Sequence, residues 1–328
     1  MYDNQSQSVD NLIETKALIE QHIHGGFGID FANCSSEDYL EFSKKILKHG
    51  VCGFFPTLAT DTLENLQVQI KEIKHAMQLQ ENLSQPMAKI LGIHLEACFI
   101  NPLKKGIHDE TQLIKPTIEN YKLLEDEAIK IVTLAPELDD DSLLCKYLRS
   151  KGVRVSAGHC LVDDLSFVDQ VTHLYNAMGT FSHRDKSTVV SALVNDDIYT
   201  ELIADMVHVQ KDVLKITFRT KPLSKIILIS DALPIAHSNK ESMDFCGKKV
   251  FLKNGKAVDA KGTMAGSTSF VSDIIKGLVS ENMLDLRTAV LMASDNINYI
   301  PEIKSQIYWD KNLNICAINI AGNLVTMA

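Results

Sequence analysis

The sequence has 328 residues, enough for one large domain or two of ordinary size. Its 45% hydrophobic and 23% charged residues are typical of a folded globular protein and exclude disorder over most of the chain. The net charge of −9, from 33 Lys and Arg against 42 Asp and Glu, argues against nucleic acid as the main partner, because a duplex-binding surface is densely basic.

The chain has seven cysteines, and no two of them lie within three residues of each other. The sequence therefore contains no CxxC motif for zinc or redox chemistry. Scattered cysteines in an odd number favour reduced thiols in a cytoplasmic protein. The N-terminus lacks the pattern of a secretory signal, and no segment approaches the roughly 18 apolar residues that cross a bilayer. We therefore expect a cytoplasmic protein with no membrane partner.

Short apolar, β-forming runs recur along the first two thirds of the chain, and helix-like segments such as 36–49 and 61–82 separate most of them. Buried parallel strands have this pattern. Eight runs predict a closed (β/α)8 barrel of the TIM type, with a doubly wound open sheet as the alternative. Between the fifth and sixth runs there is room for only a minimal crossover. The runs are 17–24, 51–57, 89–96, 129–134, 153–158, 171–174, 200–205 and 225–231.

The pattern changes after the eighth run. Residues 245–258 contain Asn254-Gly255 between β-like stretches, which is a strong hairpin signal, and residues 312–327 alternate around a second turn. Two helical stretches, 270–280 and 285–296, lie between them. We therefore expect a barrel with a small, reduced β appendage to which the C-terminus returns. The expected division is a catalytic barrel over 17–235 and 264–300, and a small β domain over 1–16, 236–263 and 301–328.

Histidines and carboxylates lie at the ends of the predicted strands, where a (β/α)8 barrel carries its catalytic groups. His22 and His24 end the first strand, and their two-residue spacing directs both imidazoles to the same face. Imidazole and carboxylate ligands together suit Zn or Fe. Each residue alone could be a packed polar group, but the combination predicts a divalent metal site. The other strand-end residues are His94, Glu96, His159, His173 and Asp231.

Ten segments carry a family resemblance. They are HIHGGFGIDF (22–31), FFPTLAT (54–60), ILGIHLE (90–96), KKGIH (104–108), VTLAPE (132–137), VSAGH (155–159), THLYNAM (172–178), DDIYTELIADMVHV (196–209), LISDAL (228–233) and GTMAGS (262–267). On these motifs the chain resembles the N-acetylglucosamine-6-phosphate deacetylase family of the amidohydrolase superfamily, over about residues 17–297. HLYNAM and GTMAGS distinguish this family from related amidohydrolases better than the HxH pair does.

The resemblance implies a set of metal ligands. Glu96, His159 and His173 match the ligands of the family's principal metal. Some members bind a second metal through the HxH pair, here His22 and His24, so one or two Zn or Fe ions are expected. In a two-metal site Glu96 would be the bridging ligand.

The resemblance also implies the catalytic and substrate-binding residues. Asp231 matches the family's catalytic aspartate, which takes a proton from water and returns it to the leaving amine. His108 matches a histidine near the acetyl group and the sugar, where it could stabilise the oxyanion. The expected reaction converts N-acetylglucosamine 6-phosphate to glucosamine 6-phosphate and acetate. The residues that match sugar-phosphate ligands are Asn176, Ala177, Arg184 and His208, and the family commonly places this arginine across a homodimer interface.

Three departures from the family pattern leave two alternatives open. Ala97 and Cys98 replace a Gly-Pro pair beside Glu96, the loop 184–187 reads RDKS in place of REPG, and Met206 stands where the family has a glycine. One alternative is an amidohydrolase whose substrate has shifted to another N-acetylated sugar phosphate or amide. The other, suggested by terminal segments that are shorter than in the family, is a non-catalytic sugar-phosphate-binding relative.

Overall fold

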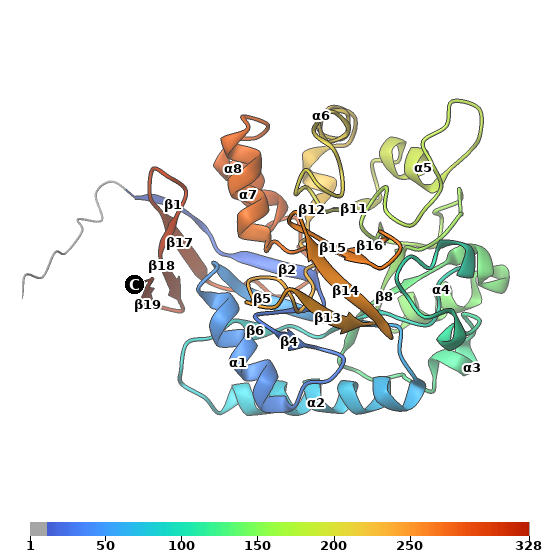
Figure 1. Cartoon of the computed structure of the whole chain (residues 1–328), viewed down its shortest axis with the longest axis horizontal. Helices are drawn as coiled ribbons and strands as arrows, with labels where there is room; N and C mark the ends of the chain where they lie inside the picture. The colour runs from blue at the N-terminus through green and yellow to red at the C-terminus, as the bar shows by residue number, and fades with distance from the viewer. Residues whose placement is uncertain (1–11, 328) are drawn as a thin grey trace, which may run out of the picture.

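Eight parallel strands form the centre of the computed structural model, which describes residues 12–327 (Figure 1). Neighbouring strands follow the order of the chain, and the short strand β6 (Lys89–Ile90) adds to β5. A parallel bridge between Ile23 and Ala232 joins the first strand to the chain just after the last, which closes the barrel and confirms the predicted fold. The eight strands are β2 (Leu18–Ile23), β5 (Val51–Ala59), β7 (Ile93–Glu96), β8 (Ile129–Leu134), β9 (Arg154–Ala157), β10 (Gln170–Val171), β11 (Tyr199–Leu202) and β12 (Ile226–Leu228).

The predicted third strand, 89–96, is divided into β6 and β7 at Gly92. This residue has φ +142°, and a Cβ atom there would lie 2.4 Å from Cγ of Lys130 and 2.8 Å from the carbonyl oxygen of Ala128. Only glycine fits such a close approach of two chain segments. The bend at Gly92 lets β7 enter the barrel between β5 and β8.

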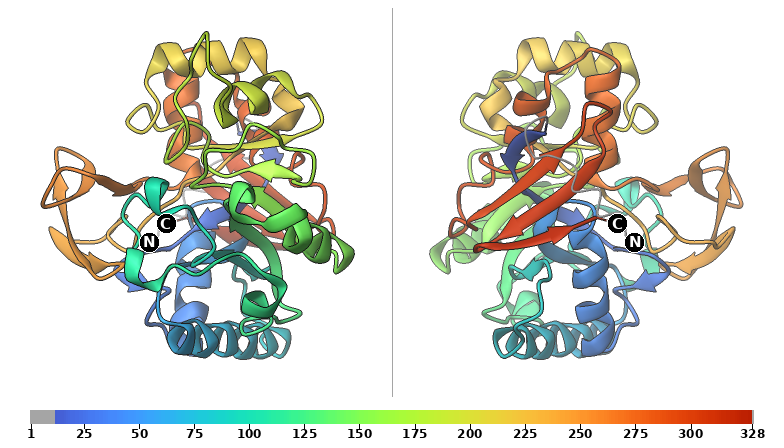
Figure 2. Two further views of the ribbon diagram at one scale, coloured as in Figure 1. Left: turned by 90° about the vertical axis from the view of Figure 1, so that its right-hand side faces the viewer. Right: turned by 90° about the vertical axis from the view of Figure 1, so that its left-hand side faces the viewer.

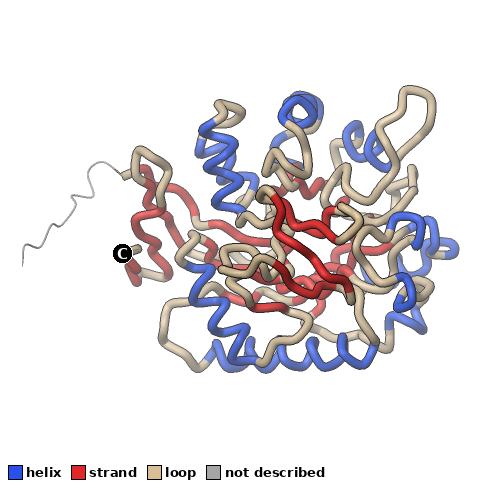
Figure 3. Tube along the Cα trace, viewed as in Figure 1, coloured by secondary structure: helices blue, strands red, loops and turns tan. Residues whose placement is uncertain are grey.

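Helices cover the outside of the barrel (Figure 3). Ser35 and Asp38 form a capping box at the start of α1, and Thr62 caps α2, so both helices begin where their sequences offer N-terminal partners. The described chain has no helix between β9 and β10, in agreement with the minimal crossover expected there. No helix within residues 12–327 is long and apolar enough to cross a membrane. The helices are α1 (Ser36–Leu47), α2 (Leu63–Glu81), α3 (Ile118–Tyr121), α4 (Leu143–Ser150), α5 (Thr188–Val194), α6 (Lys211–Thr220), α7 (Val271–Ser280) and α8 (Leu286–Met292).

Two antiparallel four-stranded sheets lie outside the barrel, at different places on its surface (Figure 2). One consists of β1 (Ile13–Lys16), β17 (Ser305–Trp309), β18 (Ile315–Ile320) and β19 (Asn323–Thr326). The other consists of β13 (Ser242–Phe245), β14 (Lys248–Lys253), β15 (Lys256–Asp259) and β16 (Met264–Gly266), with the expected hairpin at Asn254-Gly255. The predicted second turn, at 321–323, joins β18 to β19.

The two sheets share no strand, so the single small β domain that we expected is two separate structures. The two sheets are separate because they leave the barrel at different places. Strand β1 runs directly into the start of β2, whereas β13 follows the end of β12, at the opposite end of the parallel strands. Ile307 and Trp309 accordingly belong to the main core, while Met243 and Phe245 belong to a smaller cluster at the mouth. Residues 1–11 and 328 of the predicted appendage lie outside the described residues, and the exact domain division stays a prediction.

Candidate metal and active site

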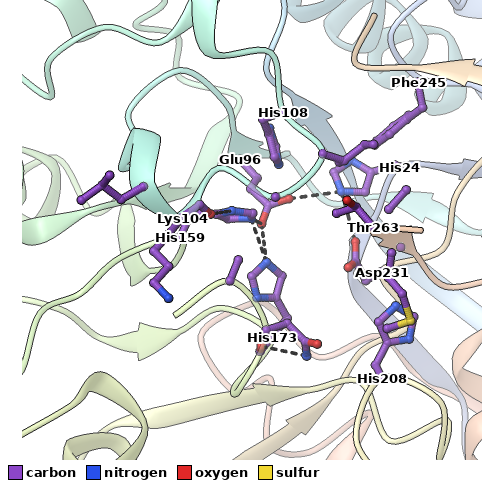
Figure 4. A pocket seen from close by; sticks show the side chains of 18 residues that line it. His24, Glu96, Lys104, His108, His159, His173, His208, Asp231, Phe245 and Thr263 are labelled. Atoms are coloured by element: carbon purple, nitrogen blue, oxygen red, sulfur yellow. Dashed lines mark hydrogen bonds and ion pairs between the residues drawn. The ribbon is translucent and has the colours of Figure 1, made fainter. Parts of the chain in front are cut away.

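A cavity of about 340 Å³ opens at the C-terminal ends of the barrel strands (Figure 4). The sheet β13–β16 contributes part of its wall through Phe245 of β13 and Met264 of β16. Most of the residues that the sequence analysis selected line this cavity, and His22 lies directly beneath it, in contact with them. The selected residues on the wall are His24, Glu96, His108, His159, His173, Asn176, Ala177, His208 and Asp231.

Glu96 is the centre of the cluster. Its Oε2 atom lies 3.1 Å from Nε2 of His22 and 3.2 Å from Nε2 of His24. Its Oε1 atom lies 3.3 Å from Nε2 of His159 and 2.9 Å from Nε2 of His173. One buried carboxylate therefore separates two pairs of imidazoles, one pair on each oxygen. We call them the β2 half of the site, with His22 and His24, and the loop half, with His159 and His173.

Asp231 completes the β2 half. Its Oδ1 atom lies 3.2 Å from Nε2 of His24 and 3.5 Å from Nε2 of His22. The backbone at Asp231 is left-handed, with φ 51°, and is held on both sides, because its N–H donates to His22 and its carbonyl accepts from Ser267. These two hydrogen bonds connect the site to the barrel closure and fix the direction of the carboxylate.

The donor set fits one or two divalent cations. His22, His24, Glu96 and Asp231 each offer an atom within 4.8 Å of the others, and the shared Glu96 also faces His159 and His173. Imidazole nitrogen and carboxylate oxygen are typical ligands of Zn and Fe. The local field also favours positive charge. Although burial opposes protonation, hydrogen bonds that His24 donates to the carboxylates of Asp231 and Glu96 raise the pKa of His24 to about 9.

The far ring nitrogens of three of the four candidate imidazole ligands are held by acceptors, and that of His173 has no partner among the described residues. Nδ1 of His24 lies 3.1 Å from the carbonyl oxygen of Thr57, and Nδ1 of His159 lies 2.8 Å from that of Lys104. Nδ1 of His22 lies 3.0 Å from a carboxylate oxygen of Glu201. A donor–acceptor pair of this kind fixes the ring so that Nε2 carries its lone pair toward the site. Glu201 was not predicted from the sequence, although a carboxylate inside the apolar run 200–205 was a usable signal.

His94 ends the same strand as Glu96 but does not reach the cavity. Its Nε2 atom lies 2.8 Å from Oγ1 of Thr133, and its Nδ1 atom lies 3.3 Å from the carbonyl oxygen of Gln21. Burial, with the nearby charge of His22, lowers the pKa of His94 to about 3, so this imidazole is neutral. His94 therefore packs beneath the metal ligands as part of the barrel interior.

His108 reaches the cavity from the loop after β7. It is 2% exposed, although a histidine after two lysines would ordinarily lie in solvent. Its Nδ1 atom accepts from the backbone N–H of Thr60 and lies 2.8 Å from Oγ1 of the same residue. Burial, with the nearby charge of His159, holds the pKa of His108 well below its usual value. The ring is therefore neutral, with its proton on Nε2 as a hydrogen-bond donor.

The residues expected to bind the sugar phosphate are only partly brought together. Asn176, Ala177 and His208 line the cavity, whereas Arg184 is exposed outside it. Nδ1 of His208 lies 2.8 Å from Asp205, and among the residues the structure describes its buried Nε2 atom has no hydrogen-bond partner. That nitrogen is available to a ligand.

Two of the departures from the family pattern lie away from the cavity. Cys98 is fully buried in the main hydrophobic core. Met206 packs against α7, where its Cε atom lies 2.9 Å from the position that a Cβ atom would take at Gly277. Neither side chain lines the cavity.

Comparison with known proteins gives the chain its relatives. It is 33% identical over 279 residues to the N-acetylglucosamine-6-phosphate deacetylase of Bacillus subtilis, over 81% of this chain and 69% of that protein. The deacetylase of Caenorhabditis elegans is 30% identical, over 97% of this chain and 84% of that protein. No family model matches the chain.

The same fold occurs in solved structures. The N-acetylglucosamine-6-phosphate deacetylase of Thermotoga maritima superposes with a TM-score of 0.88 and 24% identity, over 97% of this chain and 90% of that one. A mutant deacetylase from Mycobacterium smegmatis, in complex with N-acetyl-D-glucosamine-6-phosphate, superposes with a TM-score of 0.87 and 22% identity. The superposition covers 96% of this chain and 87% of that one.

Barrel, metal-binding cluster and relatives together define a hydrolase of the amidohydrolase class. Within that class, identity of 30% or more over most of the length of two curated relatives is decisive. The chain belongs to the N-acetylglucosamine-6-phosphate deacetylase family.

Proposed function

We propose that this protein hydrolyses the acetamide of N-acetylglucosamine 6-phosphate to give glucosamine 6-phosphate and acetate. The observation that carries the proposal is the buried Glu96 with an imidazole pair on each oxygen and Asp231 beside one pair. Family membership supports the substrate, as does the sugar phosphate bound to the Mycobacterium smegmatis relative. We propose zinc or iron as the metal and Glu96, His159, His173, His22 and His24 as its ligands.

A divalent cation bound by these ligands supplies Lewis-acid polarisation and lowers the pKa of water. Asp231 is the proton carrier of the reaction. Although burial favours its neutral form, His22 and His24 hold the pKa of Asp231 below its usual value, so the carboxylate is ready to accept a proton. It takes that proton from the attacking water and returns it to the nitrogen as the C–N bond breaks. The second proton of the water then passes from the acetic acid to the amine, so that the products are acetate and the ammonium form of the amino sugar.

His108 is placed to stabilise the oxygen of the acetyl group. Its ring lies against that of His159, with the centroids 4.7 Å apart, so it borders the loop half of the metal site. The neutral ring donates through Nε2 because Nδ1 is engaged by Thr60. A fixed donor of this kind stabilises the negative charge that develops on the carbonyl oxygen during attack.

In this proposal three groups of one subunit bind the sugar phosphate: the side chains of Asn176 and His208 and the backbone of Ala177. The second subunit of a homodimer contributes Arg184. Two features of the exposed loop support the last point. Arg184 lies outside its own cavity, and Phe181, three residues before it, is 63% exposed. An arginine can bind phosphate through two parallel hydrogen bonds once the interface places it.

The test is a substrate panel with the metal-loaded protein. Acetate release is measured from N-acetylglucosamine 6-phosphate, from N-acetylglucosamine, and from N-acetylmannosamine 6-phosphate. We expect the highest kcat/KM with the first, because N-acetylglucosamine lacks the phosphate and N-acetylmannosamine 6-phosphate has the opposite configuration at the carbon that carries the acetamide. A clear preference for another acetylated compound would favour a shifted substrate, and no hydrolysis of any panel member would favour the non-catalytic alternative.

A further inference from the structure

A fully buried carboxylate lies directly behind the β2 half of the metal site. Glu201 is the third residue of β11 and has no solvent-exposed surface. Its Oε2 atom lies 3.0 Å from Nδ1 of His22, on the side of the ring opposite the cavity. The proposed mechanism uses no proton or charge from Glu201. A buried carboxylate without a role in the reaction requires another explanation, because burying a charge is costly unless the charge is well paired.

The other oxygen of Glu201 is surrounded by donors. Oε1 accepts from the side-chain amides of Gln21 and Gln170. The direction of both amides is fixed, because the oxygen of Gln21 accepts from the hydroxyl of Tyr299 and the oxygen of Gln170 accepts from Arg154. Both NH2 groups must therefore point at Glu201. The position requires a side chain that accepts at both ends, which only an ionised carboxylate does.

The contact between Glu201 and His22 is a hydrogen bond and not a separate metal bridge. His94 is the third residue close enough to contribute a ligand atom at this point. Its Nε2 and Nδ1 atoms already face Thr133 and Gln21. With its Nδ1 proton directed to Glu201, His22 has Nε2 on the side of Oε2 of Glu96, where its lone pair would face a bound metal.

We infer that Glu201 is a positioning residue that fixes the tautomer and the direction of His22 and thereby sets the affinity of the β2 half for its metal. The inference rests on the proposed function only for the part that this metal plays in the reaction, and not for the binding of the metal. The loop half has no equivalent support at His173, whose buried Nδ1 atom has no partner among the described residues. Glu201 therefore acts on one metal position and leaves the other to Glu96, His159 and His173.

The variant Glu201→Gln tests this inference because an amide offers a single acceptor. If its oxygen faces His22, its NH2 group faces the two NH2 groups of Gln21 and Gln170. If it turns round, its NH2 group faces Nδ1 of His22, which then loses its acceptor and can place its proton on Nε2. Thr200→Val is the matched control. It changes the preceding residue of the same strand, where a buried hydroxyl has no partner in the part of the chain that the structure describes.

The experiment measures zinc binding without substrate. Metal-free protein is titrated with Zn²⁺ against a competing chelator, and bound zinc is counted by elemental analysis. We expect two zinc ions per chain in the unchanged protein and in Thr200→Val. In Glu201→Gln one site should weaken by roughly 10–100-fold while the other is unchanged. A purely structural role would instead weaken both sites together and lower the melting temperature of the metal-free form.

Three results would overturn the inference: one zinc ion per chain in the unchanged protein, unchanged affinity of both sites in Glu201→Gln, or equal weakening of both. Because the titration contains no substrate, its outcome is separate from that of the acetate assay. A protein that binds two zinc ions and hydrolyses nothing would refute the proposed function and leave the role of Glu201 standing.

Discussion

The two halves of the candidate metal site each present a pair of histidines, but the two pairs are held in different ways. His22 and His24 belong to the first strand and its end, and Glu201 and Thr57 hold their outer ring nitrogens. His159 and His173 follow the short strands β9 and β10 and have left-handed backbones, with φ 48° and 30°. In the β2 half both outer ring nitrogens are therefore held by hydrogen bonds, whereas in the loop half Lys104 holds that of His159 and, among the described residues, nothing holds that of His173, and both residues have left-handed backbones.

The loop half shows how close that packing is. A Cβ atom at Gly158, next to His159, would lie 2.6 Å from Thr133 and 2.7 Å from Thr172, so only glycine fits between these strands. The lesson of the comparison is that the carboxylate of Glu96 faces one imidazole pair whose outer nitrogens are both held and one pair in which, among the described residues, only His159 is held. Variants that act on one half, on the other, or on both test this difference.

Glu96→Ala should have the largest effect, because it removes the one ligand that both halves share. A metal supplies several kcal/mol of transition-state stabilisation, so we expect kcat/KM to fall by more than about 1000-fold. Bound zinc, counted by elemental analysis, should fall in both halves. Glu119→Gln, on the exposed face of α3, is the control and should change neither quantity. Retention of both metals by Glu96→Ala would show that the halves are independent.

Asp231→Asn should act on the β2 half alone. Loss of the proton carrier is expected to lower kcat by roughly 100- to 10,000-fold, as for other general acid–base groups. Zinc in the loop half should remain, because its ligands do not include Asp231. Steady-state acetate release and zinc counting on the same preparation check both points. Loss of zinc from the loop half would contradict the division of the site.

His108→Ala should lower kcat by roughly 100- to 1000-fold, the usual effect of removing one oxyanion donor, without changing the zinc content. The pH profile sharpens this prediction. Because burial holds the pKa of His108 well below its usual value, this ring stays neutral and should cause no loss of rate in the unchanged protein between pH 6 and 8. If the variant lost zinc from the loop half, His108 would be a ligand and not a donor to the substrate.

Lys221→Met should have the smallest effect, on the stability of the fold at the end of α5, away from the cavity. Lys221 is 2% exposed and donates to the carbonyl oxygens of Ala192 and Asn195 at the end of α5. Burial lowers the pKa of Lys221 to about 8, below the value of 10.5 in an unfolded chain. Between these values the unfolded state binds more protons, so the free energy of unfolding rises with pH.

Urea unfolding at pH 8 and pH 10 measures this rise. Lys221 should contribute roughly 1–3 kcal/mol to the difference between the unchanged protein and Lys221→Met. Equal pH dependence in the two proteins would show that Lys221 keeps its proton in the folded state. kcat should remain within a few-fold, since Lys221 does not line the cavity.

The barrel could be predicted from the sequence because parallel strands buried on both faces appear as isolated apolar runs. All eight runs contain a strand of the barrel, and the candidate ligands at their ends, except His94, line one cavity or contact the residues that line it. Two features could not be predicted in this way. Glu201 and His22 are 179 positions apart, and only the closed barrel brings them together. Periodicity also does not show at which end of the barrel each β segment lies, so the two separate sheets were expected as one domain.

The most direct test of the account is metal removal and return. The protein is stripped with a chelator, and Zn²⁺ or Fe²⁺ is added back in steps while acetate release from N-acetylglucosamine 6-phosphate is followed. We predict negligible turnover by the metal-free protein and recovery that follows the filling of the sites around Glu96. Full activity without metal, or no turnover by the fully loaded protein, would contradict the account.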